Sequence, residues 1–303
     1  MSKVITCLSS LRDVSGIKQN LRTYGGFSCT KIGITLEGKN YLLKYPANLQ
    51  AKDSFRMTDR RLNSSYSEYV GSKIFEMFYI PVHKVELVKR NDTICALCED
   101  FVKSGRLVEI GELKATYEDG FVCADGQLSA GNSNDLDETL TVIRSHPVAK
   151  LLPDFEEFFW NMFIVDTLLG NLDRAYDNFG IIVDNDSVSL APVYDNGNCL
   201  AANWSINKIS RYLGDRECME RLAYGAFTCS FRDKGECINP YELIRSGKYK
   251  GCTEALGMLK PLLLEDIIAV INEAPIPDLY KNFYTELITI RFNYLREILN
   301  DLT

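Results

Sequence analysis

The sequence is poor in histidine. Its 303 residues include only two, His83 and His146, and neither lies near a cluster of other metal-binding or nucleophilic residues in the sequence. This argues against Ser-His-Asp chemistry and against a metal site built from several histidines. Long apolar runs are also missing. The nearest candidate, residues 158–169, contains Asn161 and Asp166 and falls short of the roughly 20 residues that span a bilayer. No membrane span is therefore expected.

The chain also lacks an excess of positive charge. With 34 Lys and Arg against 41 Asp and Glu, its net charge is −7, which argues against direct binding of nucleic acid. The ten cysteines are scattered and the N-terminal residues lack the apolar core of a signal peptide, so reduced thiols in a cytoplasm are expected. Cys95 and Cys98 are predicted to lie in a strand, where residues three apart face opposite sides, and not to form a metal site.

The most informative segment is residues 170–195. It contains Asp173, Asn178 five positions later, two short apolar runs around a turn, and Asp195 just after the second run. Phosphoryl transfer from ATP uses such groups in this order. One carboxylate orients the substrate hydroxyl, and an Asn and a second carboxylate hold the metal. Each polar residue alone is also typical of a solvated turn, but their combination with the flanking elements favours the chemical interpretation.

The residues before this segment predict a buried helix. Residues 155–169 are apolar on nearly every face. Asp154 is the expected N-cap, with Glu157 closing a capping box, and Gly170 is the expected end of the helix. The polar loop that carries Asp173 therefore follows directly from a central element of the fold.

The residues after the loop predict a hairpin. Residues 179–183 and 187–190 are short apolar strands around an Asp-Asn-Asp turn. Because a hairpin folds back on itself, Asp195 is expected to return close to Asp173 and Asn178. In an extended chain these side chains would lie far apart.

The N-terminal third predicts two strands, residues 31–36 and 41–46, separated by a turn at residues 37–40. Lys44 lies on the second strand between apolar neighbours, where a lysine can reach ATP phosphates from a sheet. The alternative is a lysine on an edge strand that points into water and discourages pairing.

A helix is predicted next, from a capping cluster at residues 63–65 to Phe78. Glu68 lies in its first turn. In kinases a helix Glu pairs with the strand Lys and holds it on the phosphates. The alternative is that Ser65 and Glu68 form a capping box. Upstream, Gly25 and Gly26 precede the first strand; adjacent glycines let backbone amides approach phosphate oxygens, although the pattern is also typical of a simple turn.

The loop segment resembles that of the HipA-like serine/threonine kinases, and is most similar to their compact CtkA-type branch. The matching residues read Gly-Asn-Leu-Asp-Arg-Ala-Tyr-Asp-Asn from Gly170 and Ala-Pro-Val-Tyr-Asp up to Asp195. The resemblance implies that Asp173 is the catalytic base and that Asn178 and Asp195 are metal ligands. One departure is Ala175, where the family has a His that we expect to orient the loop.

The resemblance extends to the N-terminal third. The run Tyr-Leu-Leu-Lys-Tyr-Pro around Lys44 resembles the strand that carries the ATP-binding Lys of the family, and Ser-Glu-Tyr around Glu68 resembles the segment that carries its partner. The family also has a Tyr-Gly-Gly segment, which places Gly25 and Gly26 beside ATP.

Two further expectations follow from the resemblance. Glu99 and Phe101, at the end of a predicted strand, occupy the position of the hinge that bonds adenine through backbone groups. In some HipA-type kinases a Ser of the loop before the lysine strand is autophosphorylated, which makes Ser28 and Thr30 the candidates in this chain.

The expected fold is α+β, a bilobal protein-kinase-like architecture. Residues 1–103 form a small strand-rich lobe with one helix, and residues 104–303 form a larger, mainly helical lobe, with loop-rich residues 104–135 between them. Expected cofactors are ATP and Mg²⁺, and the expected substrate is a protein Ser or Thr hydroxyl. The family implies an antitoxin or a host protein as partner, and a cytoplasmic protein or an effector exported without a conventional signal peptide.

Two alternatives remain open. Phosphoinositide and small-molecule kinases use a similar Asp-Arg-His-x-x-Asn loop, although the acidic net charge and the lack of an evident basic amphipathic anchor argue against a lipid surface. The second alternative is a pseudokinase that binds nucleotide or a partner. Ala175 favours this alternative, and the presence of the other expected site residues argues against it.

Overall fold

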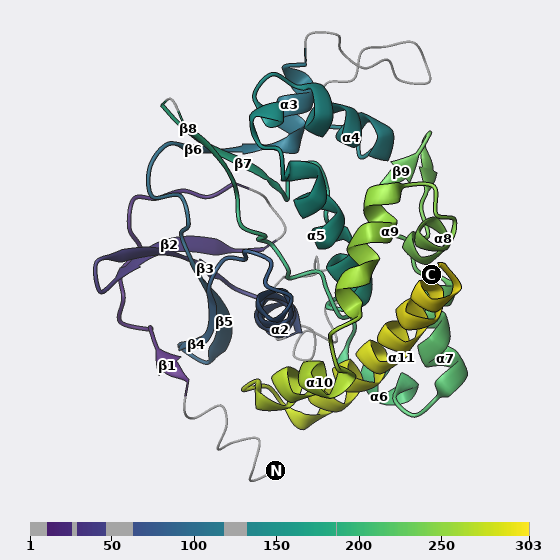
Figure 1. Ribbon diagram of the computed structural model, residues 1–303. Coiled ribbons are helices and arrows are strands. Elements are labelled where there is room, and N and C mark those ends of the chain that lie inside the picture. Colours follow the sequence, from purple (N-terminus) through teal and green to yellow (C-terminus); the bar gives the residue numbers. More distant parts are fainter. Residues whose placement is uncertain (1–10, 26–28, 47–62, 118–131, 186, 303) are drawn as a thin grey trace.

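The structure is a computed structural model that describes residues 11–25, 29–46, 63–117, 132–185 and 187–302. Its N-terminal part contains five strands: β1 (Arg12–Asp13), β2 (Lys31–Leu36), β3 (Lys39–Lys44), β4 (Val85–Arg90) and β5 (Thr93–Glu99). They form one sheet in the order β1-β4-β5-β3-β2, with β1 parallel to β4 and the other neighbours antiparallel. Figure 1 shows this sheet on the opposite side of the molecule from most helices.

The β2–β3 hairpin confirms the two predicted strands and tightens the turn between them. The pairing runs from Lys31 opposite Lys44 to Leu36 opposite Lys39, which leaves two residues in the loop. Both have positive φ, 50° at Glu37 and 77° at Gly38, as a two-residue hairpin turn of the mirror-image type requires. Lys44 therefore lies at the far end of an interior strand, between β2 and β5.

Helix α2 (Asn63–Met77) joins the sheet to the rest of the molecule. It contacts β4 and β5 on one side and α5 and α10 on the other. Tyr66, Val70 and Ile74, one or two turns apart, are fully buried, which is the spacing of a helix packed along one face. The helix confirms the prediction, and it places Glu68 between the sheet and the C-terminal part.

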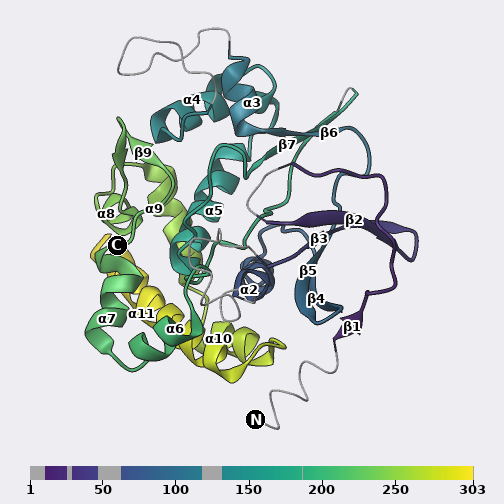
Figure 2. The ribbon, with the colours of Figure 1, turned by 180° about the vertical axis from the view of Figure 1, so that it is seen from behind.

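The C-terminal part is mainly helical. Its helices are α3 (Ile110–Ala115), α4 (Leu136–Ser145), α5 (Phe155–Leu169), α6 (Ile206–Tyr212), α7 (Arg216–Glu220), α8 (Pro240–Arg245), α9 (Lys250–Leu256), α10 (Leu264–Glu273) and α11 (Asp278–Leu302), with short 3₁₀ turns at Ala149–Leu151 and Gly257–Leu259 and a π turn at Arg221–Gly225. Two-residue strands β9 (Arg232–Asp233) and β10 (Glu236–Cys237) pair with each other. Both ribbon views show α5 flanked by α9 and α11 (Figures 1 and 2).

Helix α5 spans the predicted residues and is almost entirely buried. It ends at Gly170, whose φ of 66° is left-handed, as expected for a glycine cap. The predicted capping box is wrong, because the Asp154 side chain makes no capping hydrogen bond. With ψ near 4°, Asp154 lacks the extended backbone that normally turns an N-cap side chain toward the helix.

The predicted hairpin is β7 (Gly180–Asp184) and β8 (Ser187–Leu190), but it is not alone. A third strand, β6 (Arg106–Glu109), pairs with β7. Residues 104–135 were expected to be loop-rich, and their first part instead forms β6 and α3. The strand is short and depends on a partner far along the chain, so its own four residues carry little signal. Gly180 permits the close approach, since a Cβ there would lie 2.1 Å from the Val108 carbonyl oxygen.

A strand-rich N-terminal sheet and a helical C-terminal region confirm the expected α+β class. The division of the chain at residues 103 and 104 stays a prediction. Within the described ranges, none of the helices combines the length and the apolar character needed to cross a bilayer.

Candidate active site

A small hollow that is open to solvent lies where the N-terminal sheet meets the segment after β8. Its floor contains charged side chains from three distant parts of the sequence. The lining residues are Cys29, Lys44, Tyr45, Ser64, Ser65, Glu68, Ala96, Asp195, Gly197 and Asn198.

Lys44 is the central cation of this hollow. Its Nζ lies 2.8 Å from Glu68 Oε2 and 2.8 Å from Asp195 Oδ1. Burial alone would lower the pKa of Lys44, but the charges of Asp195 and Glu68 raise it well above its ordinary value. The alternative of a solvent-facing edge lysine is therefore wrong. The capping-box alternative for Glu68 is wrong too, because the Ser65 hydroxyl donates to the Ile94 carbonyl oxygen instead.

Glu68 has two further partners that the sequence analysis did not identify. His83 Nε2 and the Asn196 backbone N–H each lie 3.0 Å from Glu68 Oε1. Burial would raise the pKa of Glu68, but the Lys44 charge and the His83 hydrogen bond lower it below its ordinary value. Glu68 is therefore an ionised, buried carboxylate with both oxygens occupied. A lone His before a strand gave no sequence signal for this contact.

Asp173 lies at the edge of the site and is held from both ends. Its backbone N–H donates to Asn171 Oδ1 at 3.0 Å, and Asn178 Nδ2 donates to its carbonyl oxygen at 2.6 Å. Asn198 Nδ2 donates to its Oδ2 at 2.7 Å. Burial, together with the charge of Asp195, raises the pKa of the carboxyl above its ordinary value. Asn198, like His83 and Asn196, is a site residue that the sequence analysis did not identify.

Arg174 organises the loop on which Asp173 lies. It is buried and makes two hydrogen bonds to the Asp166 carboxylate, at 2.8 and 3.1 Å. It also donates to the carbonyl oxygens of Asn178 and Tyr194 and, at 2.7 Å, to Asn196 Oδ1. The loop thus has an internal anchor although Ala175 stands where the resembling family has a His.

Asn178 and the segment that carries Asp195 are both held by Arg174, which donates to the carbonyl oxygens of Asn178 and Tyr194. Because Asn178 Nδ2 already donates to Asp173, its amide oxygen is the atom left for a ligand. Asp195 has a left-handed backbone with φ of 59° and a side chain 27% exposed. An amide oxygen and a carboxylate are donors that Mg²⁺ prefers, so the residues present fit a magnesium ion.

Asp173 and Asn178 do not themselves line this hollow, and neither do the remaining predicted site residues within the described ranges. Gly25 and Thr30 are exposed, while Gly26 and Ser28 lie outside the described residues. Glu99 pairs with Lys39 and Lys103, and its backbone N–H donates to the Lys84 carbonyl oxygen. The Phe101 ring lies 5.5 Å from that of Tyr194. Their predicted contacts with ATP remain predictions.

No family model matches the chain. The sequence is 25% identical over 266 residues to the serine/threonine-protein kinase CtkA of Helicobacter pylori strain J99, which covers 86% of this chain and 78% of that protein.

Two solved structures share the fold. The proinflammatory kinase CtkA of Helicobacter pylori superposes with a TM-score of 0.83 and 23% identity, covering 97% of this chain and all of that one. HipA from Shewanella oneidensis MR-1, solved with HipB and operator DNA as a toxin–antitoxin system, matches with a TM-score of 0.51 and 13% identity, covering 99% of this chain and 72% of that one. The match to CtkA confirms the expected bilobal, kinase-like architecture.

Proposed function

We propose that this chain, which belongs to the CtkA-type branch of the HipA-like serine/threonine kinases, transfers the γ-phosphoryl group of ATP to protein Ser or Thr hydroxyls with the help of Mg²⁺. One observation carries the assignment of the site residues. Lys44, Glu68 and Asp195, of which the first and last are 151 positions apart, form one buried ion-pair chain beside Asp173.

Lys44 is the proposed phosphate-binding cation, and Glu68 its positioning partner. The Lys44 ammonium group is charged because two carboxylates surround it, and 8% of the residue is exposed. A fixed cation in a site with little water stabilises phosphate charge more strongly than a mobile one in solvent. Gly197 keeps the space beside this pair open, because a Cβ there would lie 3.0 Å from Glu68 Oε2.

Asn178 and Asp195 are the proposed metal ligands. They would hold a magnesium ion, whose positive charge would offset the negative charge that develops on the phosphoryl group during transfer. Asp195 is the only one of the two that contacts Lys44, so a metal ion and Lys44 would share its carboxylate. The amide oxygen of Asn178 is oriented by the hydrogen bond that its nitrogen makes.

Asp173 is the proposed catalytic base. Asn198 occupies Oδ2, so the substrate hydroxyl would meet Oδ1 and give up its proton there as the oxygen attacks phosphorus. The raised pKa of the carboxyl improves it as a proton acceptor.

The remaining assignments complete the proposal. Gly25 and Gly26 would approach the phosphates, and the backbone at Glu99 and Phe101 would bind adenine. The Glu99 N–H already donates to the Lys84 carbonyl oxygen, so this N–H is not available to adenine. Ser28 and Thr30 are the proposed autophosphorylation sites, and an antitoxin or a host protein is the proposed partner.

The test is incubation with Mg²⁺ and ATP followed by intact-mass measurement and by labelling of a general protein substrate such as casein. Three proteins are compared: the wild type, Asp173→Asn, and Asp177→Asn as the control. Asp177 is an exposed carboxylate of the same loop. We expect transfer by the wild type and the control, and a loss of about 100-fold or more in Asp173→Asn.

Equal transfer by Asp173→Asn would contradict its role. Peptide mapping of the modified wild type decides between Ser28, Thr30 and other hydroxyls. Phosphate that appears on phosphoinositide vesicles and not on protein would favour the lipid-kinase alternative. Calorimetric binding of ATP that requires Mg²⁺, without transfer to any acceptor, would favour a pseudokinase.

A further inference from the structure

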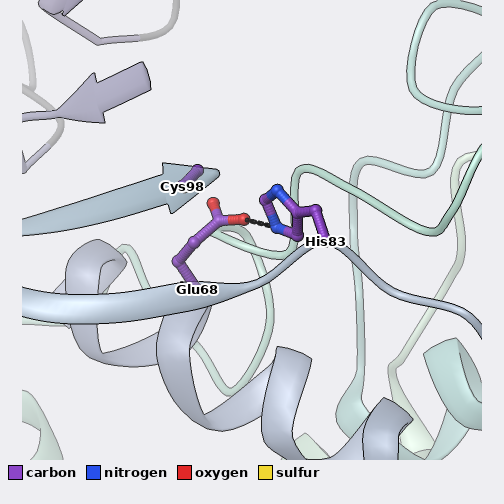
Figure 3. A group of neighbouring side chains, drawn as sticks. All are labelled: Glu68, His83 and Cys98. Atoms are coloured by element: carbon purple, nitrogen blue, oxygen red, sulfur yellow. Dashed lines mark hydrogen bonds and ion pairs between the residues drawn. The ribbon is translucent and has the colours of Figure 1, made fainter. Parts of the chain in front are cut away.

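A buried group of three side chains lies directly behind the Lys44–Glu68 pair. Glu68 comes from α2, His83 from the segment before β4, and Cys98 from β5 (Figure 3). Their ligand atoms all lie within 4.8 Å of one another. Such a group has two interpretations, a metal centre or a set of contacts that positions Glu68.

The hydrogen bonds argue against a metal centre. Glu68 Oε2 is taken by Lys44, and Glu68 Oε1 accepts from both His83 and the Asn196 backbone. An ion would have to break these contacts and would face the charge of Lys44. Burial raises the pKa of the Cys98 thiol well above its ordinary value, so the thiolate that metals prefer is disfavoured there.

The position of His83 indicates what the contact does. Its backbone N–H donates to the Val193 carbonyl oxygen at 2.9 Å, and the Val193 N–H donates to Pro81 at 2.8 Å. Val82 and Val193 form a parallel bridge. His83 is thus fixed to a residue that lies two positions before Asp195, while its ring reaches Glu68 on α2.

We propose that His83 is a positioning residue for nucleotide binding, acting through Glu68. The inference rests on the proposed function, and it deepens it. Because Glu68 is ionised, His83 Nε2–H donates to Oε1 and leaves Oε2 directed at Lys44. The ring also links α2 to the segment that ends at Asp195, so the cation and the metal-binding carboxylate keep one relative placement.

Two substitutions separate the hydrogen bond from the packing of the ring. Gln places an amide N–H near the position of Nε2, whereas Leu fills similar space and donates nothing. Loss of a charge-assisted hydrogen bond predicts that His83→Leu raises the KM for ATP and the calorimetric Kd for Mg–ATP about tenfold. We expect kcat to change less, because Asp173 is untouched, and His83→Gln to recover most of the affinity.

The chain offers a matched control in its other histidine. His146 is also 5% exposed and lies 3.3 Å from the Thr116 hydroxyl, in the α3–α4 region. We expect His146→Leu to lower the melting temperature without changing the affinity for Mg–ATP. An equal affinity loss in His146→Leu would mean general destabilisation and would overturn the inference.

Other outcomes are equally decisive. The inference fails if His83→Leu binds Mg–ATP as the wild type does, or if His83→Gln is as defective as His83→Leu at the same melting temperature. Zinc binding by the wild type that is lost in both His83→Leu and Cys98→Ser would establish a metal centre instead. If the wild type transfers phosphate and His83→Leu has the same affinity for Mg–ATP, this inference is wrong but the proposed function stands. A wild type that does not bind Mg–ATP sinks the proposed function as well.

Discussion

Two buried cations, Lys44 and Arg174, contact the same short segment, residues 194–196, and their other partners differ in kind. The contacts described for Lys44, from the N-terminal sheet, are with the carboxylates of Glu68 and Asp195. Arg174, from the loop after α5, binds the Asp166 carboxylate and also two backbone carbonyl oxygens. Both side chains are ion-paired, but of the two only Arg174 is described as also donating to backbone carbonyl oxygens.

This difference separates contacts that form before nucleotide binds from contacts that we expect to change when it binds. Arg174 bonds groups that the proposed chemistry leaves alone, so the loop has its shape before any nucleotide arrives. Lys44 bonds Asp195, the proposed metal ligand, so binding of Mg–ATP would redistribute its contacts. The planar fork of arginine suits the first task, and the single ammonium of lysine suits the second.

The largest expected effect is on protein stability, from loss of the contacts that Arg174 makes. Arg174→Met would leave Asp166 as a buried carboxylate with Asn171 as its remaining described partner. We expect a loss of about 3–5 kcal/mol in the free energy of unfolding, measured by urea denaturation. Arg144→Met is the control, because its pair with Glu156 is half exposed and should contribute about 0–1 kcal/mol. Equal losses of unfolding free energy in the two variants would show that the buried Arg174–Asp166 pair contributes no more than an exposed one.

Lys44→Met probes the other cation and should reduce phosphoryl transfer by about 100-fold or more. It also leaves Glu68 buried without the lysine charge, with His83 and the Asn196 backbone N–H as its remaining described partners. Lys44→Met with Glu68→Gln removes that orphan charge, and we expect the double variant to be more stable than Lys44→Met by about 1–3 kcal/mol. Strict additivity in denaturation experiments would show that the pair does not couple.

The smallest expected effect concerns a carboxylate that has no ion-pair partner in the described part of the chain. Burial, with the charges of Asp177 and Glu112, raises the pKa of Glu109 to about 7. The folded protein therefore holds this proton more tightly than the unfolded chain. The resulting stabilisation is complete below the unfolded pKa of 4.5 and is lost as pH rises toward 7.

Glu109→Gln should remove this dependence. We expect the variant to melt at a higher temperature than the wild type near pH 8 and at a similar temperature near pH 4. Glu86→Gln, at an exposed position of β4, is the control for the change in net charge. A wild type and a variant whose melting temperatures differ equally at both pH values would rule out the proton linkage.

Sequence reasoning succeeded where contacts are local. Helix α5 and its glycine end were predicted residue by residue, because an apolar helix followed by a left-handed glycine is written in adjacent positions. The β7–β8 hairpin and the β2–β3 strands followed from alternation and turn residues. The capping box at Asp154 failed because a cap depends on one backbone angle that composition does not determine.

The site divides in the same way. The sequence analysis identified Asp173, Asn178 and Asp195 because they lie in one continuous segment of loop and hairpin. It identified Lys44 and Glu68 because the strand and the helix that carry them have recognisable sequence patterns. Their metal, base and phosphate roles remain proposals. Asn198 was missed because its contact with Asp173 crosses the hairpin, 25 positions along the chain.

By itself, the sequence determined the local elements, the absence of multi-histidine or membrane-span signals, and the order of acidic and amide groups suited to phosphoryl transfer. Tertiary structure alone decided that His83 contacts Glu68, that Arg174 anchors the loop after α5, and that β6 extends the hairpin. The physical reason is that His, Arg and short strands are common in any sequence. Their roles here depend on burial and on contact with partners far along the chain, which only folding brings together.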